Sequence, residues 1–278
     1  LKYALRESIE LLGNEAIHYI KEIRRDGVFE GRIDAEQLSL ECLRYMYRML
    51  FLFYIEARPE LGFVPVKSEA YRTGYSLESL RSLEMVHLTT EESRNGYFFH
   101  ESLDLLFSMI WNGFNPTPIN QQNQKSDSAI SRIHTFDIKP LKSHLFDPER
   151  ISMLSKVKFR NHVLQQIIKN MSLSREGGRN SRRGRISYAQ LGINQLGAVY
   201  EALLCYRGFF AEHDLYEVKR ETDPSDILAT AYFVKKDDLE KYSESERVFD
   251  DTGHLVCHPK GKFIYRMAGR DRAKTASY

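Results

Sequence analysis

The chain has 278 residues, of which 42% are hydrophobic and 28% are charged. This length and apolar content exclude a largely disordered protein and allow one large domain or two small ones. The sequence holds 40 Lys and Arg against 38 Asp and Glu, and its net charge of +2 excludes a chain that is basic throughout. A surface for nucleic acid would therefore have to be local.

The three cysteines are far apart in the sequence and form no CxxC pair. This pattern disfavours a disulfide framework and a cysteine-based zinc site, and it favours a reducing cytoplasm. No apolar run reaches the roughly 18–20 residues of a membrane span, and no signal peptide opens the chain. Because the first residue is Leu1 rather than Met, we expect the sequence to begin inside a longer polypeptide.

Two long helices are predicted first. Apolar residues at steps of three or four predict a helix over residues 1–25, ended by Asp26-Gly27. Asp34 is the predicted N-cap of a second helix over residues 35–57. This second segment is apolar on nearly all sides after Tyr45, which predicts a helix at the centre of the core.

The pattern continues with shorter elements. Residues 60–75 read as a loop, and Ser76 is the predicted cap of a helix over residues 77–88. Gly and Pro punctuation and apolar periodicity predict these further segments in order: a helix at 98–111 ended by Gly113, a loop at 115–130, a helix near 161–170, a polar break at 172–186, a helix near 189–204, and short strands at 209–210, 215–218 and 229–234.

The predicted fold is therefore mainly α (α+β), with a multi-helix N-terminal domain and a small antiparallel β element in the C-terminal third, within residues 207–236. We divide the chain into a helical domain over residues 1–114, a loop-rich connecting region over 115–186, and a helix with the β element over 187–278.

The strongest local charge feature lies in the second polar break. Five arginines fall within eleven positions, separated by glycines and opposed only by Glu176: Arg175, Arg179, Arg182, Arg183 and Arg185. A flexible backbone lets guanidinium groups follow a curved phosphate backbone, so we predict that these five residues bind DNA. A solvated surface loop without a partner is the alternative.

Other candidate sites carry weaker signals. The basic tail from Lys260 interleaves Phe263 and Tyr265, which suits stacking on bases, but the alternation favours a strand that packs these rings inward. The Glu217-x-Lys219 pair on a predicted strand is half of a metal-dependent nuclease arrangement, or simply an amphipathic strand. His254, Cys257 and His258 lack a second ligand pair, so a surface turn is favoured over zinc. We predict no catalytic constellation and no metal site in this chain.

Several segments together resemble a known family. They are residues 51–58 (FLFYIEAR), 71–81 (YRTGYSLESLR), 144–150 (HLFDPER), 191–204 (LGINQLGAVYEALL) and 262–278 (KFIYRMAGRDRAKTASY). In this order they resemble the N-terminal region of large bacterial adenine-specific DNA methyltransferases of phage-defence and restriction-modification systems. These include the PglX-like enzymes of BREX, the related methylase of DISARM, and type IIG enzymes. The helix of the pattern LG-x-x-x-LG-x-x-YE-x-LL is the most specific of these segments.

The resemblance implies a parent enzyme that flips an adenine out of double-stranded DNA and methylates its exocyclic nitrogen with S-adenosylmethionine. The glycine-rich cofactor turn and the NPPY-type tetrad of the family do not occur in this sequence. The chain therefore resembles the part that precedes the methylase domain, and only Tyr278 approaches the cofactor-binding side. The resemblance also implies partners among the other subunits of a defence system.

Two other functions remain open. The chain could be a protein-interaction module of a defence complex that does not contact DNA. It could also be a nuclease domain of a type IIG enzyme, in which case Glu217 would be needed for metal-dependent cleavage.

Overall fold

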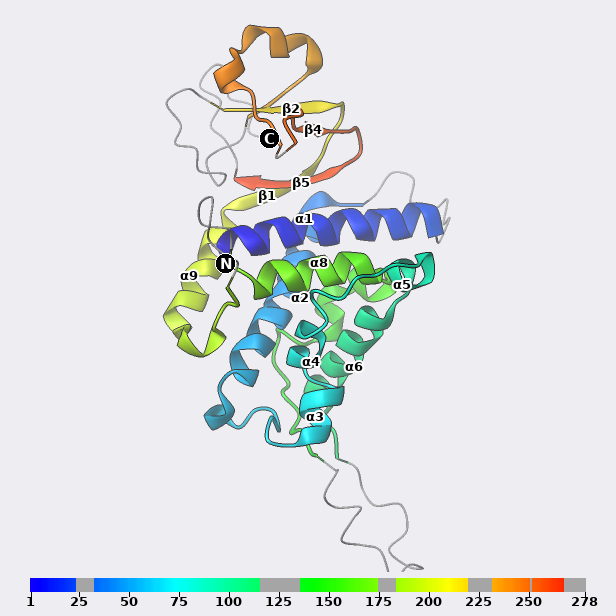
Figure 1. Ribbon diagram of the computed structural model, residues 1–278, viewed down its shortest axis with the longest axis vertical. Helices are drawn as coiled ribbons and strands as arrows, with labels where there is room; N and C mark the ends of the chain where they lie inside the picture. Colours follow the sequence, from blue (N-terminus) through cyan, green and yellow to red (C-terminus); the bar gives the residue numbers. More distant parts are fainter. Residues whose placement is uncertain (24–32, 116–135, 175–183, 220–231, 251, 268–278) are drawn as a thin grey trace, which may run out of the picture. The chain divides into compact units, whose positions relative to one another are not determined.

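The computed structural model describes residues 1–23, 33–115, 136–174, 184–219, 232–250 and 252–267 (Figure 1). Among these residues the fold is mainly helical with small antiparallel sheets in the C-terminal third, as predicted. The chain divides into two compact units: unit 1 combines Leu1–Leu40 with Ile193–Tyr278, and unit 2 is Glu41–Gly192. This grouping differs from the three consecutive segments of the sequence-based division, because it joins the first helix to the last third of the chain.

Unit 1 is built on helix α1, Lys2–His18, which continues as a single π-helical turn over Tyr19–Ile23. The predicted apolar face is buried at Leu5, Ile9, Leu12 and Ala16. In Figure 1, α1 in blue lies along strand β5 in red, Phe263–Met267. β5 pairs antiparallel with β1, Tyr206–Phe210, which follows helix α9, Ile193–Leu204.

The packing of the Phe263 ring explains why positions 13 and 208 of unit 1 are glycine. A Cβ added at Gly13 would lie 2.5 Å from the Phe263 ring, and one added at Gly208 would lie 2.5 Å from the same ring and 2.0 Å from Ser39 Oγ. The ring, which is fully buried, therefore packs directly against the backbone of α1 and β1.

A second sheet in unit 1 has the strand order β3-β2-β4. Its strands are β2 at Leu215–Val218, β3 at Tyr232–Val234 and β4 at Cys257–His258. The β structure thus extends beyond the predicted range of 207–236, because β4 lies just before the basic tail and β5 lies within it. Pairing with β1 buries both Phe263 and Tyr265, so the inward-facing strand expected from the alternation is confirmed.

Helix α2, Ala35–Glu56, is the long central helix that the sequence predicts. The backbone N–H of Glu36 donates to Asp34 Oδ1 at 2.9 Å, which confirms the predicted N-cap. Most apolar side chains of α2 are buried, among them Leu38, Met46 and Leu52 with no exposed surface.

The other helices of unit 2 are α3 Glu69–Gly74, α4 Leu77–Arg81, α5 Glu91–Asn95, α6 Phe98–Asn112 and α8 Asn161–Ser172. Helix α8 packs against α4, α5 and α6. Gly113 ends α6 with a positive φ of 79°. The linker predicted at 115–130 lies, apart from Asn115, outside the described residues.

Two sequence-based predictions in unit 2 are wrong in extent. The region 60–75 contains helix α3 rather than loop alone. The helix predicted over 77–88 ends at Arg81, and the residues after it form i→i+3 turn bonds and contacts with the Gln165 side chain. Gln165 Nε2 donates to the carbonyls of Leu83 at 2.9 Å and Val86 at 2.7 Å.

Candidate nucleic-acid interface

The two ends of the arginine-rich segment meet in unit 2. Leu173 and Arg185 form an isolated antiparallel bridge. The N–H of Ser174 donates to the carbonyl of Gly184 at 2.8 Å, and the N–H of Gly184 donates back to Ser174 Oγ at 3.0 Å. Because these bonds pair residue 174 with residue 184, the segment between them starts and finishes at one place on unit 2. We call the paired residues 172–174 and 184–186 the loop base.

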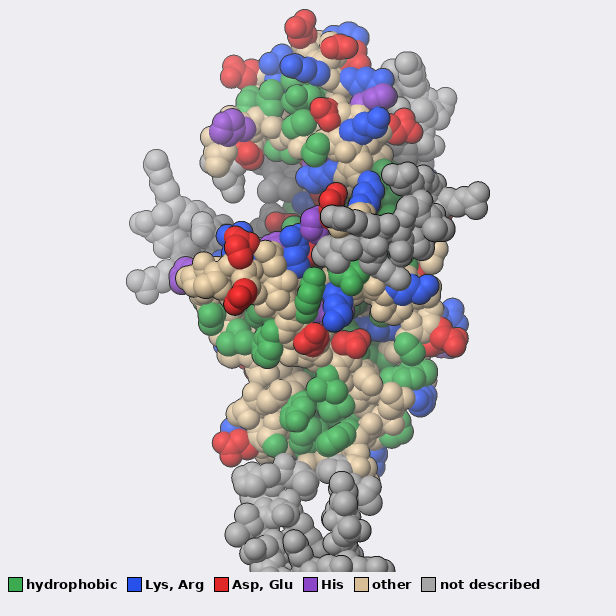
Figure 2. All heavy atoms as spheres, turned by 90° about the vertical axis from the view of Figure 1, so that its right-hand side faces the viewer, with side chains coloured by type: hydrophobic (Ala, Val, Ile, Leu, Met, Phe, Trp, Pro, Cys, Tyr) green, Lys and Arg blue, Asp and Glu red, His purple; other side chains and the backbone are tan. Residues whose placement is uncertain are grey.

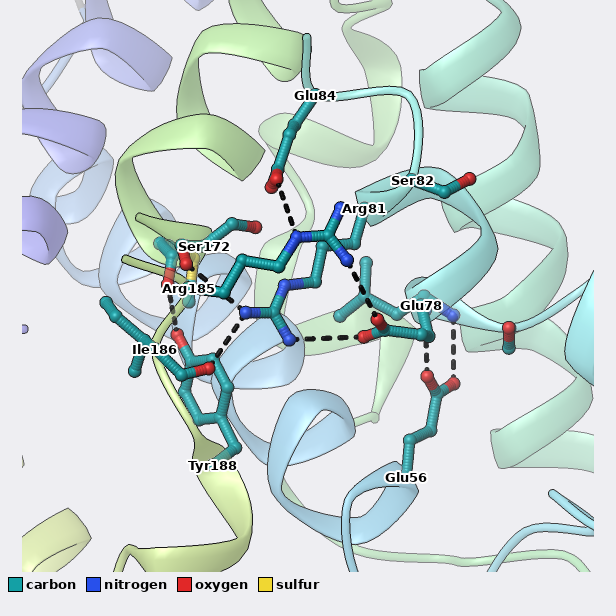
Figure 3. Close-up of polar contacts among 12 residues, drawn as sticks. Glu56, Glu78, Arg81, Ser82, Glu84, Ser172, Arg185, Ile186 and Tyr188 are labelled. Carbon is teal, nitrogen blue, oxygen red and sulfur yellow. Dashed lines mark hydrogen bonds and ion pairs between the residues drawn. The ribbon is translucent and has the colours of Figure 1, made fainter. Parts of the chain in front are cut away.

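Arg81 of α4 holds both sides of the loop base (Figure 3). Its Nη2 donates to the carbonyls of Ser172 at 3.2 Å and Ile186 at 2.8 Å. The carbonyl of Ser172 also accepts from the N–H of Ile186 at 2.8 Å. Arg81 is only 8% exposed, and its guanidinium lies over the stacked rings of Phe53 and Tyr188. A buried cation thus links the two strands of the loop base.

Arg185 is the one predicted DNA-binding residue that the structure describes. Its Nε donates to Glu84 Oε1 at 3.1 Å, and its Nη1 lies 3.8 Å from Glu78 Oε1. The Arg185 side chain is 51% exposed, whereas that of Glu84 is only 3% exposed. The guanidinium is therefore held by carboxylates of this chain, and its contact with DNA stays a prediction. The other four predicted residues, Arg175, Arg179, Arg182 and Arg183, lie outside the described residues.

Glu56, at the end of α2, holds the start of α4. Its carboxylate accepts from the N–H groups of Leu77 and Glu78, both at 2.9 Å, and from the Tyr71 hydroxyl at 2.8 Å. Burial raises the pKa of Glu56 to about 7, although these three hydrogen bonds oppose the rise. Glu56 thus fixes the helix that carries Glu78 and Arg81.

Sequence reasoning missed Glu56, Arg81 and Glu84 as structural residues of this site. Arg81 and Glu84 have partners about a hundred positions away, at residues 172, 185 and 186. A pattern of local periodicity carries no signal for such contacts.

The second half of α2 and the residues just after it are linked by arginine side chains to later parts of unit 2. Arg58 donates through Nη2 to the carbonyls of Ala189 at 3.0 Å and Leu191 at 2.8 Å. Arg48 of α2 donates to the carbonyls of Leu145 and Asp147, both at 2.7 Å. Of the segments that resemble the methyltransferase family, these bonds join 51–58 directly to 191–204 through Arg58 and Leu191.

The Glu217 carboxylate lies beside basic side chains. Its Oε2 is 3.1 Å from His258 Nε2 and 3.5 Å from Arg266 Nη2, and Arg266 also pairs with Glu10. Burial raises the pKa of Glu217, but the hydrogen bond from His258 and the charge of Arg266 outweigh it, so the pKa is lowered. Cationic neighbours on this side disfavour a bound metal ion. Among the described residues, no group of three or more His, Cys, Asp and Glu could hold one.

Arg6 adds a further cation to this part of unit 1. It is 6% exposed, and its Nε and Nη1 have no hydrogen-bond partner among the described residues. Burial and the charge of Arg266 lower its pKa. Lys and Arg side chains are interspersed with Asp and Glu on the face that Figure 2 shows, so no broad basic surface stands out there.

Helix α9 presents apolar side chains to solvent. Ile193, Tyr200 and Leu204 are 71%, 41% and 50% exposed, and only Leu203 of this helix is buried. With Gly197 these positions follow the spacing i, i+4, i+7, i+11, which places them on one face of the helix. A Cβ added at Gly197 would meet no atom within 4 Å. We call Ile193, Gly197, Tyr200 and Leu204 the α9 stripe.

The described residues do not fit a site for S-adenosylmethionine. None of the described strands leads through a glycine-rich turn into a helix, which is the arrangement the family uses. Tyr278, the predicted cofactor-side residue, lies outside the described residues.

Comparison with protein-family models, with curated proteins and with solved structures found no match. Among the described residues, no helix is long and apolar enough to cross a membrane.

Proposed function

We propose that this chain is the N-terminal helical region of a site-specific adenine-N6 DNA methyltransferase of a phage-defence or restriction-modification system. In this role it supports the catalytic domain and contacts double-stranded DNA through the arginine-rich segment. S-adenosylmethionine would be bound by the methylase domain of the parent enzyme, outside the described residues. The ordered series of resembling segments supports this parentage.

The observation that carries DNA contact is the loop base. Because residues 174 and 184 are hydrogen-bonded, Arg175, Arg179, Arg182 and Arg183 all belong to one connection that begins and ends at the same point. Four arginines within this short stretch of sequence concentrate positive charge in a protein whose net charge is only +2. Their guanidinium forks match pairs of phosphate oxygens.

The test is the salt dependence of duplex binding. Fluorescence anisotropy of a labelled duplex is measured across a salt series for the wild type and for a variant with all five arginines changed to Ala. The logarithm of the binding constant should fall steeply with the logarithm of salt concentration for the wild type, by roughly 0.9 for each phosphate neutralised. The variant should bind all sequences more weakly and with a flatter slope, because phosphate contacts carry no base information. Identical curves would reject DNA contact by this segment.

The α9 stripe favours a second candidate function, a protein-interaction module. Exposed apolar positions along one helix face are typical of surfaces that bind another protein. The same anisotropy experiment separates the two functions, because an interaction module predicts no salt-dependent binding of DNA.

A further inference from the structure

We propose that Arg185 is a positioning residue for DNA contact: together with Glu84 it holds the loop base, and it does not itself bind phosphate. This inference rests on the proposed function for its role in binding. Its structural part rests on the described residues of the loop base alone.

The first step is the asymmetry of the Arg185–Glu84 pair. Glu84 exposes only 3% of its side chain, while Arg185 exposes 51%. The Arg185 Nε–H donates to Glu84 Oε1 at 3.1 Å. If Arg185 swung out to a phosphate, it would leave a buried carboxylate without this partner, and an uncompensated buried charge is strongly unfavourable. A phosphate contact at the surface, screened by salt, offers less in return.

The second step is the position of Arg185 in the chain. It is bridged to Leu173, and its neighbours Gly184 and Ile186 are hydrogen-bonded to Ser174 and Ser172. Arg81, whose guanidinium lies over the stacked rings of Phe53 and Tyr188, donates to the carbonyls of Ser172 and Ile186. Figure 3 shows the guanidinium groups of Arg81 and Arg185 both directed toward the Glu78 carboxylate. The Arg185–Glu84 pair therefore ties one strand of the loop base to α4 and the turn after it.

The proposal predicts that a variant can lower the affinity for DNA without changing the slope of its salt dependence. A residue that contacts phosphate contributes to the slope, whereas a residue that only orders the segment changes affinity at every salt concentration equally. Glu84→Gln is the sharpest variant, because it leaves every basic residue in place and removes the buried one of the two carboxylate charges that hold Arg185. Arg179→Ala, within the segment, is the matched control.

The binding experiment repeats the anisotropy series with these variants. Arg179→Ala should flatten the slope by about 0.9. Glu84→Gln and Arg185→Ala should bind about threefold to tenfold more weakly with the wild-type slope, because the loop base is held less firmly before binding. A flatter slope for Arg185→Ala would show that Arg185 binds phosphate and would overturn the proposal. A steeper slope for Glu84→Gln would also overturn it, since it would mean that Glu84 keeps Arg185 away from DNA.

Trypsin cleavage in the absence of DNA tests the positioning separately, since trypsin cuts after Arg. Glu84→Gln and Arg81→Gln should be cut several times faster than the wild type within residues 175–183, because a released base gives the protease access. Unchanged rates would overturn the positioning role. Wild-type protein that binds no DNA, with faster cleavage of the variants, would reject the proposed function and keep the structural role of Glu84 and Arg185.

Discussion

The two units differ in how they accommodate buried charge. In unit 2 the buried charged side chains bond mainly to backbone groups of distant segments. Glu41 accepts from the N–H groups of Met153 and Leu154, both at 2.9 Å, and Arg48 donates to the carbonyls of Leu145 and Asp147. These side chains satisfy backbone groups that have no helical or sheet partner.

In unit 1 the buried charged side chains bond mainly to one another. Arg266 pairs with Glu10 and Glu217, and Glu217 also pairs with His258. The strand ladders satisfy much of the backbone here, although Glu10 also accepts from the N–H of Tyr265 at 3.4 Å and Arg266 donates to the carbonyl of Tyr265 at 3.1 Å. The difference teaches that unit 2, which is built from short helices and irregular connections, depends on single side chains as structural links. We expect it to be the more sensitive unit to their loss.

The largest expected effect is the loss of Arg48. This side chain is 2% exposed and makes two hydrogen bonds of 2.7 Å to carbonyls of the segment 144–150. Arg48→Ala removes the side-chain donor from both carbonyls, leaves that of Asp147 with only the N–H of Arg150 at 3.2 Å, and opens a cavity beside Phe107 and Phe146. Since a hydrogen bond to a charged group contributes about 1.5–3 kcal/mol, we expect the free energy of unfolding to fall by about 3–5 kcal/mol, measured by urea denaturation.

Arg44 is the matched control for Arg48. It lies one turn earlier on α2 and also donates to a carbonyl of the segment 144–150, that of Arg150 at 2.9 Å, but this bond is exposed to water. Arg44→Ala should cost less than about 1 kcal/mol, because water replaces the lost partner. Equal losses for the two variants would mean that burial of the link is irrelevant and would break the comparison between the units.

The elements that could be predicted from the sequence are those stabilised locally. Periodicity placed α1, α2, α6 and α8 to within a few residues, and Asp34 and Ser76 were identified as caps because their partners lie two or three positions ahead. The helix at 77–88 was predicted too long, and the residues after its end contact Gln165, a residue about eighty positions away.

Only the amino-acid composition of the candidate site could be predicted from the sequence. The cluster of arginines is visible in the sequence, but the closed loop base is not, since it depends on one bridge and three backbone or hydroxyl hydrogen bonds. The pairing of Arg185 with Glu84 joins positions 101 apart and has no local signature. The extent of the β structure was underestimated because β5 takes part only through its pairing with β1.

The next largest expected effect is a pH dependence of the free energy of unfolding, to which Glu56 of unit 2 and Glu217 of unit 1 contribute with opposite signs. The pKa of Glu56 rises from 4.5 to about 7 in the folded state, so the folded protein keeps a proton that the unfolded chain releases above about pH 4.5. Its contribution to stability is therefore present below about pH 4.5 and is lost as the pH rises to 7, by roughly 2–3 kcal/mol. For Glu217 the folded pKa is lowered, so its stabilisation is present above 4.5 and is lost as the pH falls through the folded value.

Urea unfolding of the wild type and of Glu56→Gln at pH 4.5 and pH 7.5 measures the first contribution. The amide cannot titrate, so the variant should lose less stability between these two values than the wild type does, and other titrating groups cancel in the difference. A parallel pH profile for the two proteins would show that the hydrogen bonds from Tyr71, Leu77 and Glu78 keep the carboxylate ionised in spite of burial.

The smallest expected effect tests whether a single hydroxyl can act as a structural link in unit 2. Ser76 is 2% exposed, and its Oγ accepts from the N–H of Ser79 at 3.0 Å at the start of α4. Ser76→Ala removes this cap and the bond that the same hydroxyl donates to the carbonyl of Arg72 at 2.6 Å, and it should lower the free energy of unfolding by about 1–2 kcal/mol, in the range known for N-caps. Ser68 precedes α3 in the same way but makes no side-chain cap bond, so Ser68→Ala should change stability by less than about 0.5 kcal/mol. Thermal and urea denaturation of both variants measure the difference. If the two substitutions cost the same, the cap bond contributes nothing beyond helix propensity, and the dependence of unit 2 on side-chain-to-backbone bonds would be limited to its charged residues.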